Sequence, residues 1–420
     1  MKIAIIGSGG REHALAATIS KSSKINEIFC IPGNAGTSKI AINVELDINE
    51  FDKVQKFIND NSIDLVVIGP EQPLVNGIVD YLEKFNIKVF GPNKIASQLE
   101  GSKIFTKKLC QEYNIPTANF GIFENRIDAK KFLENSNYPN VIKADNLAAG
   151  KGVYICNSKK ESLMAVEEIF DGKFGEAKNV LIEEFLEGEE MSYFIISDGT
   201  TIKSFETAQD HKRVLEGDNG KNTGGMGAYS PSRLINNDLE DKILSKIIKP
   251  TLKGLKNLGT EYKGFLYAGL MIVKNEPYLI EYNVRMGDPE CQTILPKLKT
   301  DLLEIIEACC DKKLVDINIE WTNKKSLCVV LCSKGYPDTY QKNILIDNLE
   351  NFNLDENNFI FHAGTKKEKD EIYAIGGRVL NFISLSDNFL QARDEVHQSL
   401  KKLDWNGGFY RRDIGFKVID

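Results

Sequence analysis

Residues 279–290 read Leu-Ile-Glu-Tyr-Asn-Val-Arg-Met-Gly-Asp-Pro-Glu, and this stretch decides the fold that the sequence predicts. Glu281, Asn283 and Arg285 alternate with bulkier, less polar residues. Because the side chains of a strand alternate between its faces, the carboxylate, the amide and the guanidinium are predicted to share one face. Oxygen ligands suit Mg²⁺, which commonly shares substrate phosphates, and arginine binds phosphate or carboxylate with a planar fork. The stretch therefore favours phosphoryl transfer, although a solvated edge strand can carry the same residue types.

The composition is that of a globular protein. The chain has 420 residues, enough for about two to four domains with a sizeable core. A formal net charge of −7 gives no electrostatic reason to expect nucleic acid or an anionic membrane as a partner. The sequence contains no segment typical of a secretion signal or a membrane span. Its eight cysteines are scattered without a C-x-x-C pair, which fits reduced thiols and a cytoplasmic location.

The first hundred residues repeat a strand followed by a glycine-bearing loop. Lys2–Ile6 is an apolar strand, Gly7–Gly10 forms a turn, and a helix is expected from Arg11. Similar strands follow at residues 28–31, 64–68 and 88–90. This recurrence favours a doubly wound parallel sheet with ligands at the carboxyl ends of its strands.

The first of these turns is typical of an anion site. A helix that begins after a glycine turn presents backbone N–H groups to a phosphate. The dinucleotide fingerprint, however, needs glycine at position 12, where this chain has Glu12. A nicotinamide or flavin site is therefore disfavoured, and a smaller phosphate ligand stays open.

Two segments in the middle of the chain suit a nucleotide. A helix is expected from residue 101 through Cys110, and a strand at residues 141–145 carries Lys143 into a loop of small residues. Small residues let a backbone approach phosphates closely, and lysines neutralise their charge, although a flexible hairpin is the alternative. The apolar strand from Val180 is followed by an acidic segment at residues 183–190. This segment is either a solvated face or a hinge that contacts adenine and ribose. The loop at residues 222–227 is predicted to close over a site.

The last hundred residues predict a small α/β domain. Strands are expected at Ser326–Cys332, Phe359–Ala363 and Gly376–Leu380, and a helix at residues 382–403. His13 is near the first glycine turn, whereas His362 and His397 are interpreted as packing or surface residues.

Taken together, these motifs resemble the glycinamide ribonucleotide synthetase (phosphoribosylamine-glycine ligase) family of the ATP-grasp superfamily. The resemblance runs from Lys2 to about Gly415 in the family's order. The matching segments are Gly9–Ala14, Pro32–Gly36, Lys143–Gly152, Glu183–Glu190, Gln209–Arg213, Asn222–Tyr229, Glu281–Glu290 and His362–Thr365.

The resemblance implies a three-part α/β fold. An N-terminal doubly wound parallel-sheet domain that binds substrate would span residues 1–101, and an ATP-grasp core would span 102–322. A mobile lid at about 118–191 would be inserted in that core. A small α/β domain at 323–420 would complete the chain.

The resemblance also implies the reaction and its participants. The family joins glycine to 5-phosphoribosylamine, converts ATP to ADP and phosphate, and forms glycinamide ribonucleotide in purine biosynthesis through glycyl phosphate. ATP and Mg²⁺, with Mn²⁺ as the alternative metal, are the expected cofactors. The expected partners are these small molecules, with no nucleic acid and no membrane, and the enzyme would be a cytoplasmic monomer or weak homo-oligomer.

Individual site residues follow from the same resemblance. Glu281 and Asn283 would hold the metal, and Lys143, Arg285 and Asp288 would serve the chemistry. The ATP site would comprise Lys103, Lys143, Ala148, Ala149, Gly150, Lys151, Gly152, Glu183, Glu184, Leu186 and Glu190. The glycine and phosphoribosylamine sites would comprise Gly9, Gly10, Glu12, Asn34, Asp210, Arg285 and Asp288.

Three other functions compete with this interpretation. A related ATP-grasp carboxylase would use bicarbonate instead of glycine. A dinucleotide-dependent oxidoreductase is disfavoured by Glu12, and a nucleotide-binding regulator without turnover is disfavoured by Lys143, Glu281 and Asn283. The strand at Phe265–Val273 also lacks the additional carboxylate that many ATP-grasp enzymes carry, so the metal would depend on phosphate and water. Val284 and Met286 stand where relatives are expected to have cysteine and phenylalanine, a difference that bears on packing.

Overall fold

The N-terminal part of the chain is a five-stranded parallel sheet in the order β3-β2-β1-β4-β5. The computed structural model describes residues 1–145, 152–175, 179–349, 352 and 354–419. The central strand β1 is buried from Ile3 to Gly7, as expected for a strand that helices cover on both faces. The strands are β1 (Lys2–Gly7), β2 (Glu27–Pro32), β3 (Ile42–Asn43), β4 (Leu65–Ile68) and β5 (Val89–Phe90). The predicted parallel sheet is confirmed, and the short strand β3 is an addition to it.

Helices follow the glycine-bearing loops of this sheet. The strand order reverses direction between β1 and β4, so the loops after these two strands lie next to each other at the carboxyl edge, at the position of the crevice that binds ligands in such sheets. The helices are α1 (Gly10–Ile19), α2 (Phe51–Asp60), α3 (Glu71–Asn76), α4 (Ile78–Glu83), α5 (Gln98–Gly101) and α6 (Lys103–Glu112).

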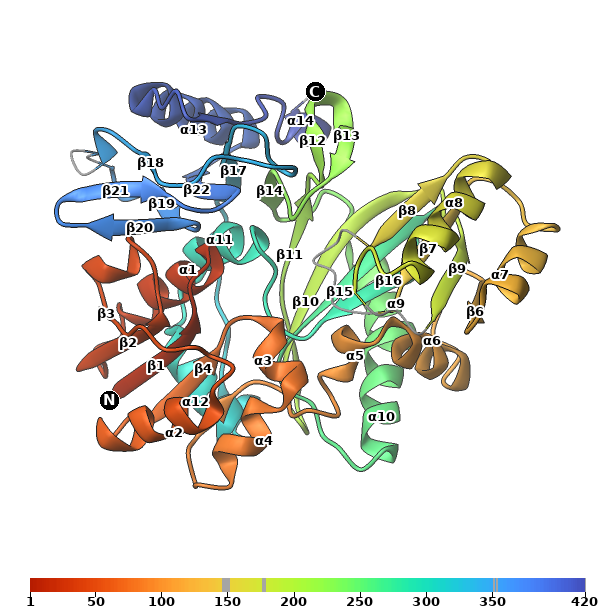
Figure 1. Cartoon of the computed structure of the whole chain (residues 1–420). Helices are drawn as coiled ribbons and strands as arrows, with labels where there is room; N and C mark the ends of the chain where they lie inside the picture. The colour runs from red at the N-terminus through yellow and green to blue at the C-terminus, as the bar shows by residue number, and fades with distance from the viewer. Residues whose placement is uncertain (146–151, 176–178, 350–351, 353, 420) are drawn as a thin grey trace.

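Residues 120–184 form a separate antiparallel sheet in the order β6-β9-β7-β8. Figure 1 shows this sheet on the right, away from the N-terminal sheet at the lower left. It has its own apolar core, in which Ile142 and Ile182 pack against Leu133 and Val166 of the two helices. The elements are β6 (Phe120–Phe123), α7 (Arg126–Leu133), β7 (Asn140–Ala144), β8 (Val153–Cys156), α8 (Lys159–Phe170) and β9 (Val180–Glu184).

A nine-stranded sheet joins the middle of the chain to its C-terminal part. Its order is β16-β15-β10-β11-β14-β17-β22-β19, with β23 beside β17. The pairing of β14 with β17 carries the sheet across the expected domain boundary at residue 323. The strands are β10 (Glu189–Asp198), β11 (Ile202–Asp210), β14 (Gly227–Ser230), β15 (Lys263–Val273), β16 (Glu276–Asn283), β17 (Lys325–Ser333), β19 (Asn358–His362), β22 (Arg378–Ser386) and β23 (Gly408–Phe409).

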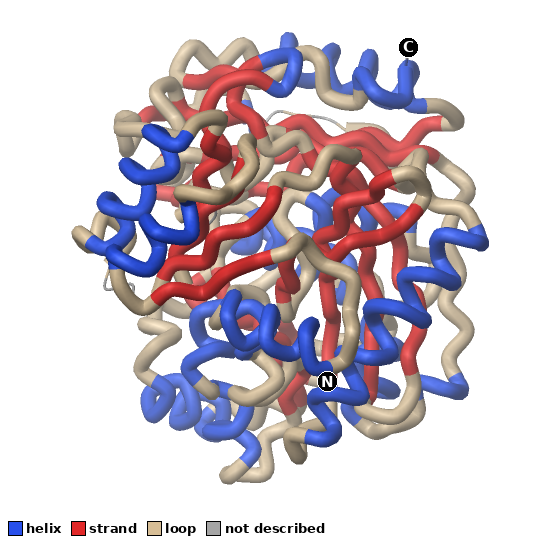
Figure 2. Tube along the Cα trace, turned by 90° about the vertical axis from the view of Figure 1, so that its right-hand side faces the viewer, coloured by secondary structure: helices blue, strands red, loops and turns tan. Residues whose placement is uncertain are grey.

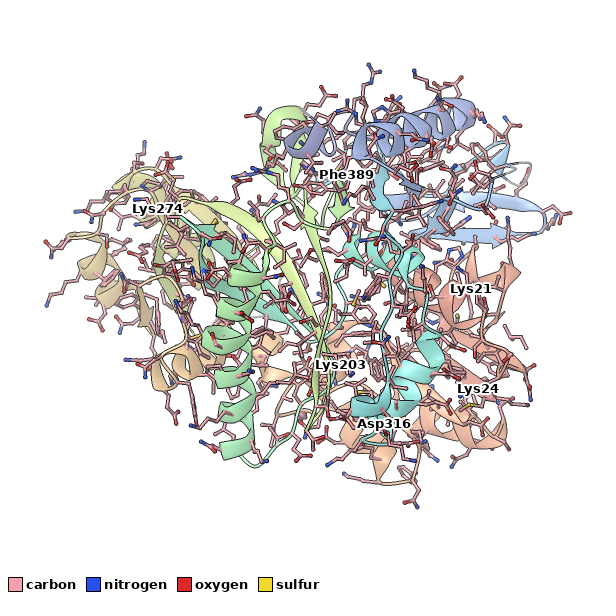
Figure 3. The ribbon with its side chains drawn as sticks, turned by 180° about the vertical axis from the view of Figure 1, so that it is seen from behind. Lys21, Lys24, Lys203, Lys274, Asp316 and Phe389 are labelled. Carbon is pink, nitrogen blue, oxygen red and sulfur yellow. The ribbon has the colours of Figure 1, made fainter. Side chains whose placement is uncertain are left out.

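Smaller elements complete the fold, and helices surround the sheets in Figure 2. Helix α12 connects the core to the N-terminal part, because Glu304 and Glu307 pair with Lys24, which Figure 3 labels. The remaining elements are β12 (Arg213–Leu215), β13 (Asn219–Asn222), α9 (Asn237–Ile243), α10 (Lys249–Asn257), α11 (Glu290–Ile294), α12 (Leu302–Cys310), β18 (Ile344–Leu345), β20 (Thr365–Glu368), β21 (Glu371–Ala374), α13 (Phe389–Leu403) and α14 (Phe416–Ile419).

The helix predicted at residues 382–403 was wrong in its first part. Strand β22 continues to Ser386, where its buried residues pair with β17 and β19. Helix α13 begins only at Phe389, because the Asn388 side chain accepts a hydrogen bond from the N–H of Gln391 and caps it. No helix among the described residues has the length and apolar character needed to cross a membrane.

Candidate active site

Strand β16 presents polar side chains on one face, as its alternation predicts. Glu281 and Asn283 are partly exposed, whereas Tyr282 and Val284 are buried. On the neighbouring strand β15, Gly269 lies opposite Glu281 and leaves the space beside its carboxylate without a side chain. Neither Glu281 nor Asn283 makes a side-chain hydrogen bond within the described residues. Their oxygens are thus available to a cation.

Arg285 lies two residues beyond the end of β16, in a bend, and is held by two carboxylates. Its Nη2 lies 2.6 Å from Oε1 of Glu100, and its Nε lies 3.3 Å from Oε2 of Glu71. The positive charge of Arg285 lowers the pKa of Glu71 to about 2. Burial raises the pKa of Glu100 to about 7, because Arg285 and Arg11 only partly offset the loss of solvent and the repulsion by Glu71. The guanidinium is therefore rigidly placed, and one of its carboxylates changes charge near neutral pH.

A buried carboxylate joins two lysines at the base of the β6–β9 sheet. Nζ of Lys143 donates to Oε2 of Glu183 at 2.9 Å, and Nζ of Lys107 lies 3.1 Å from Oε1. Lys107 also donates to Oγ1 of Thr117 at 2.6 Å. Although burial opposes it, the two lysines lower the pKa of Glu183. The Glu183 side chain thus positions Lys143, and its backbone lies in the sheet between β6 and β7, opposite Phe120 and Val141.

Lys103 is brought to the same region by the start of helix α6. Oδ1 of Asp145, at the end of β7, accepts hydrogen bonds from Oγ of Ser102 at 3.1 Å and from the N–H of Ile104 at 3.2 Å. Lys103 lies between these two donors, and burial lowers its pKa while Glu281 partly offsets this effect. The structure thus gathers Lys103, Lys143 and Glu281.

The remaining residues expected at ATP differ in their surroundings. The Glu184 carboxylate binds the backbone N–H and the side chain of Asn119. Oε2 of Glu190 lies 2.6 Å from Nζ of Lys212, whose charge lowers the pKa of Glu190. Leu186 is half-buried, and Gly152 is buried in a turn whose carbonyl accepts from the N–H of Ala144. The predictions for Ala148, Ala149, Gly150 and Lys151 fall outside the described residues.

The turn after β1 is capped by the protein's own carboxylates. The N–H of Gly9 donates to Oε2 of Glu12 at 2.6 Å, and the N–H of Arg11 donates to Oδ2 of Asp288 at 3.3 Å. Gly10 lies so close to the side chains of Asn381 and Gln292 that a Cβ there would be 2.4 Å and 2.5 Å from their nitrogens. Glu12 therefore replaces the fingerprint glycine with a cap, and segments far apart in sequence meet at this helix end.

Asn34 joins the N-terminal part to the C-terminal part. Its Nδ2 donates to the carbonyl oxygens of Ser8 at 2.8 Å and of His362 at 2.9 Å. Its Oδ1 accepts from the N–H groups of Gly36 and Thr37. Its backbone is engaged as well, because its N–H donates to Oγ1 of Thr37 and its carbonyl oxygen accepts from Nδ2 of Asn43, so Asn34 shapes these loops with both its side chain and its backbone. His362 is buried, in agreement with the packing role expected for it.

Two acidic residues complete the site, one at the end of β11 and the other in the turn before α11. Asp210 ends β11, and its Oδ1 is buried without a hydrogen bond in the described residues. Burial and the nearby Glu290 raise the pKa of Asp210. Asp288 is different, because Arg378 and Arg11 overcome burial and lower its pKa, and Nε2 of Gln292 donates to its Oδ1 at 2.8 Å.

Several residues of this site were absent from the sequence-based prediction. Lys107 follows Lys103 by four positions on one helix, which places both on one face, and this spacing was a usable signal. Glu71 and Glu100 reach Arg285 from segments 214 and 185 residues away. Arg378 reaches Asp288 across 90 residues. No local pattern in the sequence marks these long-range partners.

Comparison with known families accounts for nearly the whole chain. The models described as phosphoribosylglycinamide synthetase N domain, ATP-grasp (A) domain and C domain match residues 1–100, 101–291 and 326–417, respectively.

Relatives and solved structures agree with these matches. Phosphoribosylamine–glycine ligase of Mesorhizobium japonicum is 46% identical over 420 residues, covering 100% of this chain and 99% of the relative. The crystal structure of phosphoribosylamine–glycine ligase from Thermotoga maritima has a TM-score of 0.87 and 33% identity, covering 99% of this chain and 100% of that one. A biotin carboxylase domain from Hydrogenobacter thermophilus, solved with MgADP, shares the fold at a TM-score of 0.74 and 17% identity, covering 97% of this chain and 91% of that one.

Proposed function

Because the chain belongs to the phosphoribosylglycinamide synthetase family, and is an ATP-grasp ligase that joins glycine to phosphoribosylamine in purine biosynthesis, we propose that its reaction passes through glycyl phosphate. The glycine carboxylate attacks the γ-phosphorus of ATP, and ADP leaves. The amine of 5-phosphoribosylamine then attacks the carbonyl carbon of glycyl phosphate. Inorganic phosphate leaves, and glycinamide ribonucleotide is formed. This sequence needs no nucleophile from the protein.

Glu281 and Asn283 are the residues that would hold the metal. Their two oxygen donors share one face of β16 and make no internal hydrogen bond among the described residues, which fits Mg²⁺, or Mn²⁺ as the alternative. Among these residues there is no group of three acidic, histidine or cysteine ligands, so phosphate and water would complete the shell. When bound, Mg²⁺ would neutralise charge on the phosphates.

Lys103, Lys143 and Arg285 would surround the transferring phosphoryl group. Glu183 fixes Lys143, while Glu71 and Glu100 fix Arg285, so each cation needs little reorganisation when negative charge develops. This arrangement, beside the free oxygens of Glu281 and Asn283, is the observation that carries the proposed chemistry. Glu183, Glu184, Leu186 and Glu190 would face the adenosine, and Ala148–Gly152 would cover the phosphates.

The N-terminal crevice and the carboxylates beside it would bind the other two substrates. Gly9, Gly10 and Glu12 form the turn that faces Asp288, and Asn34 fixes the adjoining loop. Oδ1 of Asp210 accepts no hydrogen bond from the described residues, which suits a substrate amine. Closure of residues 118–191 over these sites would protect the acyl phosphate from water.

Glycine-dependent ADP formation tests the reaction. The purified protein is given Mg-ATP and phosphoribosylamine made in place from ribose 5-phosphate and ammonia, with glycine or bicarbonate as the second substrate. Glycine alone should support ADP release, with an equal amount of glycinamide ribonucleotide by mass spectrometry. ADP release that requires bicarbonate and ignores glycine would assign the chain to a sister ligase.

The glycyl phosphate intermediate is tested separately from the overall reaction. If glycyl phosphate forms, [¹⁸O]carboxyl-labelled glycine should transfer one labelled oxygen to the inorganic phosphate. Unlabelled phosphate would contradict the intermediate.

A cytoplasmic location is supported by the free thiols of all cysteines in the structure. The expected monomer or weak homo-oligomer is testable by sedimentation.

A further inference from the structure

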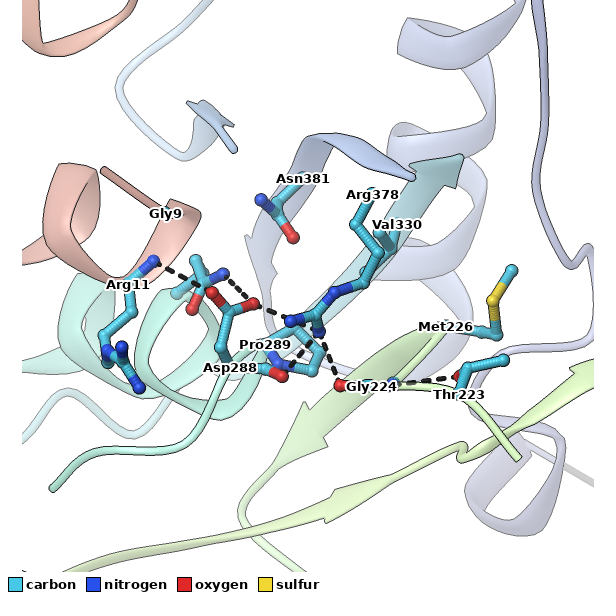
Figure 4. Close-up of polar contacts among 12 residues, drawn as sticks. Gly9, Arg11, Thr223, Gly224, Met226, Asp288, Pro289, Val330, Arg378 and Asn381 are labelled. Atoms are coloured by element: carbon cyan, nitrogen blue, oxygen red, sulfur yellow. Dashed lines mark hydrogen bonds and ion pairs between the residues drawn. The ribbon is translucent and has the colours of Figure 1, made fainter. Parts of the chain in front are cut away.

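Arg378, at the start of β22, reaches from the C-terminal part into the site (Figure 4). Its Nη1 donates to the carbonyl oxygen of Gly224 at 2.5 Å and to that of Asp288 at 2.6 Å. The same nitrogen lies 3.2 Å from Oδ1 of Asp288. One nitrogen of the guanidinium thus ties the glycine-rich loop at residues 222–227 to the segment that follows Arg285.

The other edge of this guanidinium carries two unused donors. Nε and Nη2 of Arg378 have no hydrogen bond or ion pair within the part of the chain that the structure describes. The side chain keeps 22% of its surface exposed, so it is not fully packed against protein. The N–H bonds of Nε and Nη2 lie on one edge of the guanidinium plane and are parallel. This is the geometry with which arginine binds phosphate or carboxylate through two parallel hydrogen bonds.

The plane of the guanidinium is also fixed. A Cβ at Gly224 would lie 3.0 Å from Cζ and 3.2 Å from Nη2 of Arg378, so the glycine backbone packs directly against the group. Gly224 is held in turn, because its N–H donates to the hydroxyl of Tyr336 at 3.0 Å. An anion that binds at this edge would accept hydrogen bonds from two donors, Nε and Nη2, that are already oriented.

The other well-placed cations near the substrates are occupied by carboxylates. Arg285 lies between Glu71 and Glu100, and Lys212 pairs with Glu190. Arg11 pairs with Glu12. Arg378 also lies beside a carboxylate, that of Asp288, but it differs from the two arginines because its contacts with the described residues use only one of its nitrogens.

We infer that Arg378 binds the 5-phosphate of phosphoribosylamine through Nε and Nη2, so that the C-terminal part of the chain completes this substrate site. The inference rests on the proposed function. Asp288 connects Arg378 to the N–H of Arg11 at the end of the N-terminal crevice, away from the proposed ATP residues on the β6–β9 sheet. The 5-phosphate is the anionic group of phosphoribosylamine, so it is the part of this substrate that two free arginine donors would bind.

Steady-state kinetics of Arg378→Met tests the assignment. The KM for phosphoribosylamine should rise about tenfold to a hundredfold, because two charge-assisted hydrogen bonds are lost, while the KM values for ATP and glycine stay within about twofold. Arg378→Lys, which keeps the charge but loses the planar edge, should show a smaller rise in the same KM. Arg393→Met, on the outer helix α13, is the matched control and should behave as wild type.

Competition by stable compounds identifies the group that is recognised. Ribose 5-phosphate should inhibit the wild type competitively against phosphoribosylamine, ribose should inhibit far less, and Arg378→Met should abolish the difference. Unchanged KM for phosphoribosylamine in Arg378→Met, or equal loss for all three substrates, would overturn the assignment. If that variant does not fold, Arg378→Lys decides, and an unchanged KM there overturns it. A wild type without glycine-dependent ADP formation would refute the proposed function instead.

Discussion

Nζ of Lys143 lies 2.9 Å from Oε2 of Glu183 in a buried ion pair. The second oxygen of that carboxylate is 3.1 Å from Lys107, a lysine of helix α6, whereas Lys143 and Glu183 belong to the β6–β9 sheet. Lys107 therefore connects the sheet to the core of the molecule and shares the charge that positions Lys143.

Replacing Lys107 with methionine should weaken both stability and ATP binding. Oε1 of Glu183 would lose its nearby cation, which costs about 1–3 kcal/mol of unfolding free energy, and Lys143 would lie less precisely against the phosphates. Urea unfolding and the KM for ATP report the two effects. Lys108→Met, on the exposed side of the same helix, is the control. Equal behaviour of the two variants would contradict the role of Lys107.

Glu281→Ala should abolish turnover and leave the fold intact. Its carboxylate makes no hydrogen bond in the described residues, and its charge favours the charged forms of Lys103 and Lys212, so the loss falls on the metal and on these two lysines. We expect kcat/KM to fall at least about a hundredfold, since a metal that bridges phosphate oxygens contributes several kcal/mol. Glu276→Ala, at the exposed start of the same strand, should keep normal activity. Near-normal turnover in Glu281→Ala would remove this residue from the metal site.

Glu100 should make the stability of the protein depend on pH. Its pKa rises from 4.5 to about 7 on folding, so between these values the folded chain holds a proton that the unfolded chain has released. Its contribution to the unfolding free energy therefore decreases as pH rises from 4.5 to 7, by up to about 1.4 kcal/mol per pH unit. Glu100→Gln should remove this share of the slope in urea titrations at several pH values. The exposed residue Glu112 provides the control variant, Glu112→Gln. If the unfolding free energy of Glu100→Gln changed with pH as steeply as that of the control, Glu100 would not titrate in this range.

Asn34→Asp should loosen the contact between the two ends of the chain. The carboxylate could still accept from Gly36 and Thr37, but it has no N–H to give to the carbonyls of Ser8 and His362. The buried carbonyl of His362, left without this donor, costs about 1–3 kcal/mol, which thermal unfolding would detect. Asn61→Asp loses one hydrogen bond at a half-buried helix end and should cost less. If both variants were equally stable, the Asn34 side chain would not stabilise the contact between the N-terminal and C-terminal parts.

The sequence was most informative where structure is set by neighbouring residues. The alternation of Glu281 and Asn283 with Tyr282 and Val284 is a local property of a strand, and the structure confirms it in the burial of these residues, but the strand ends at Asn283, before Arg285. The parallel N-terminal sheet was likewise visible in the recurrence of apolar strands and glycine loops.

Long-range partners and element ends were harder to predict. Residues 382–386 suit a helix or a strand, and pairing of β22 with β17 and β19 decided the outcome. The two carboxylates that hold Arg285, and the arginine that reaches Asp288, come from distant segments, so only the folded topology brings them together. Glu12 was correctly interpreted as incompatible with a dinucleotide fingerprint, but its capping role required the geometry of the turn.

The pairing of β14 with β17 has a consequence for how the molecule can be divided. A cut at residue 323 would leave one fragment with the exposed edge of β14 and the other with the exposed edge of β17. Neither fragment is expected to remain soluble alone, and the two halves should melt in a single cooperative transition. The sheet of residues 120–184, which has its own core, could instead be excised or exchanged as a module between related ligases.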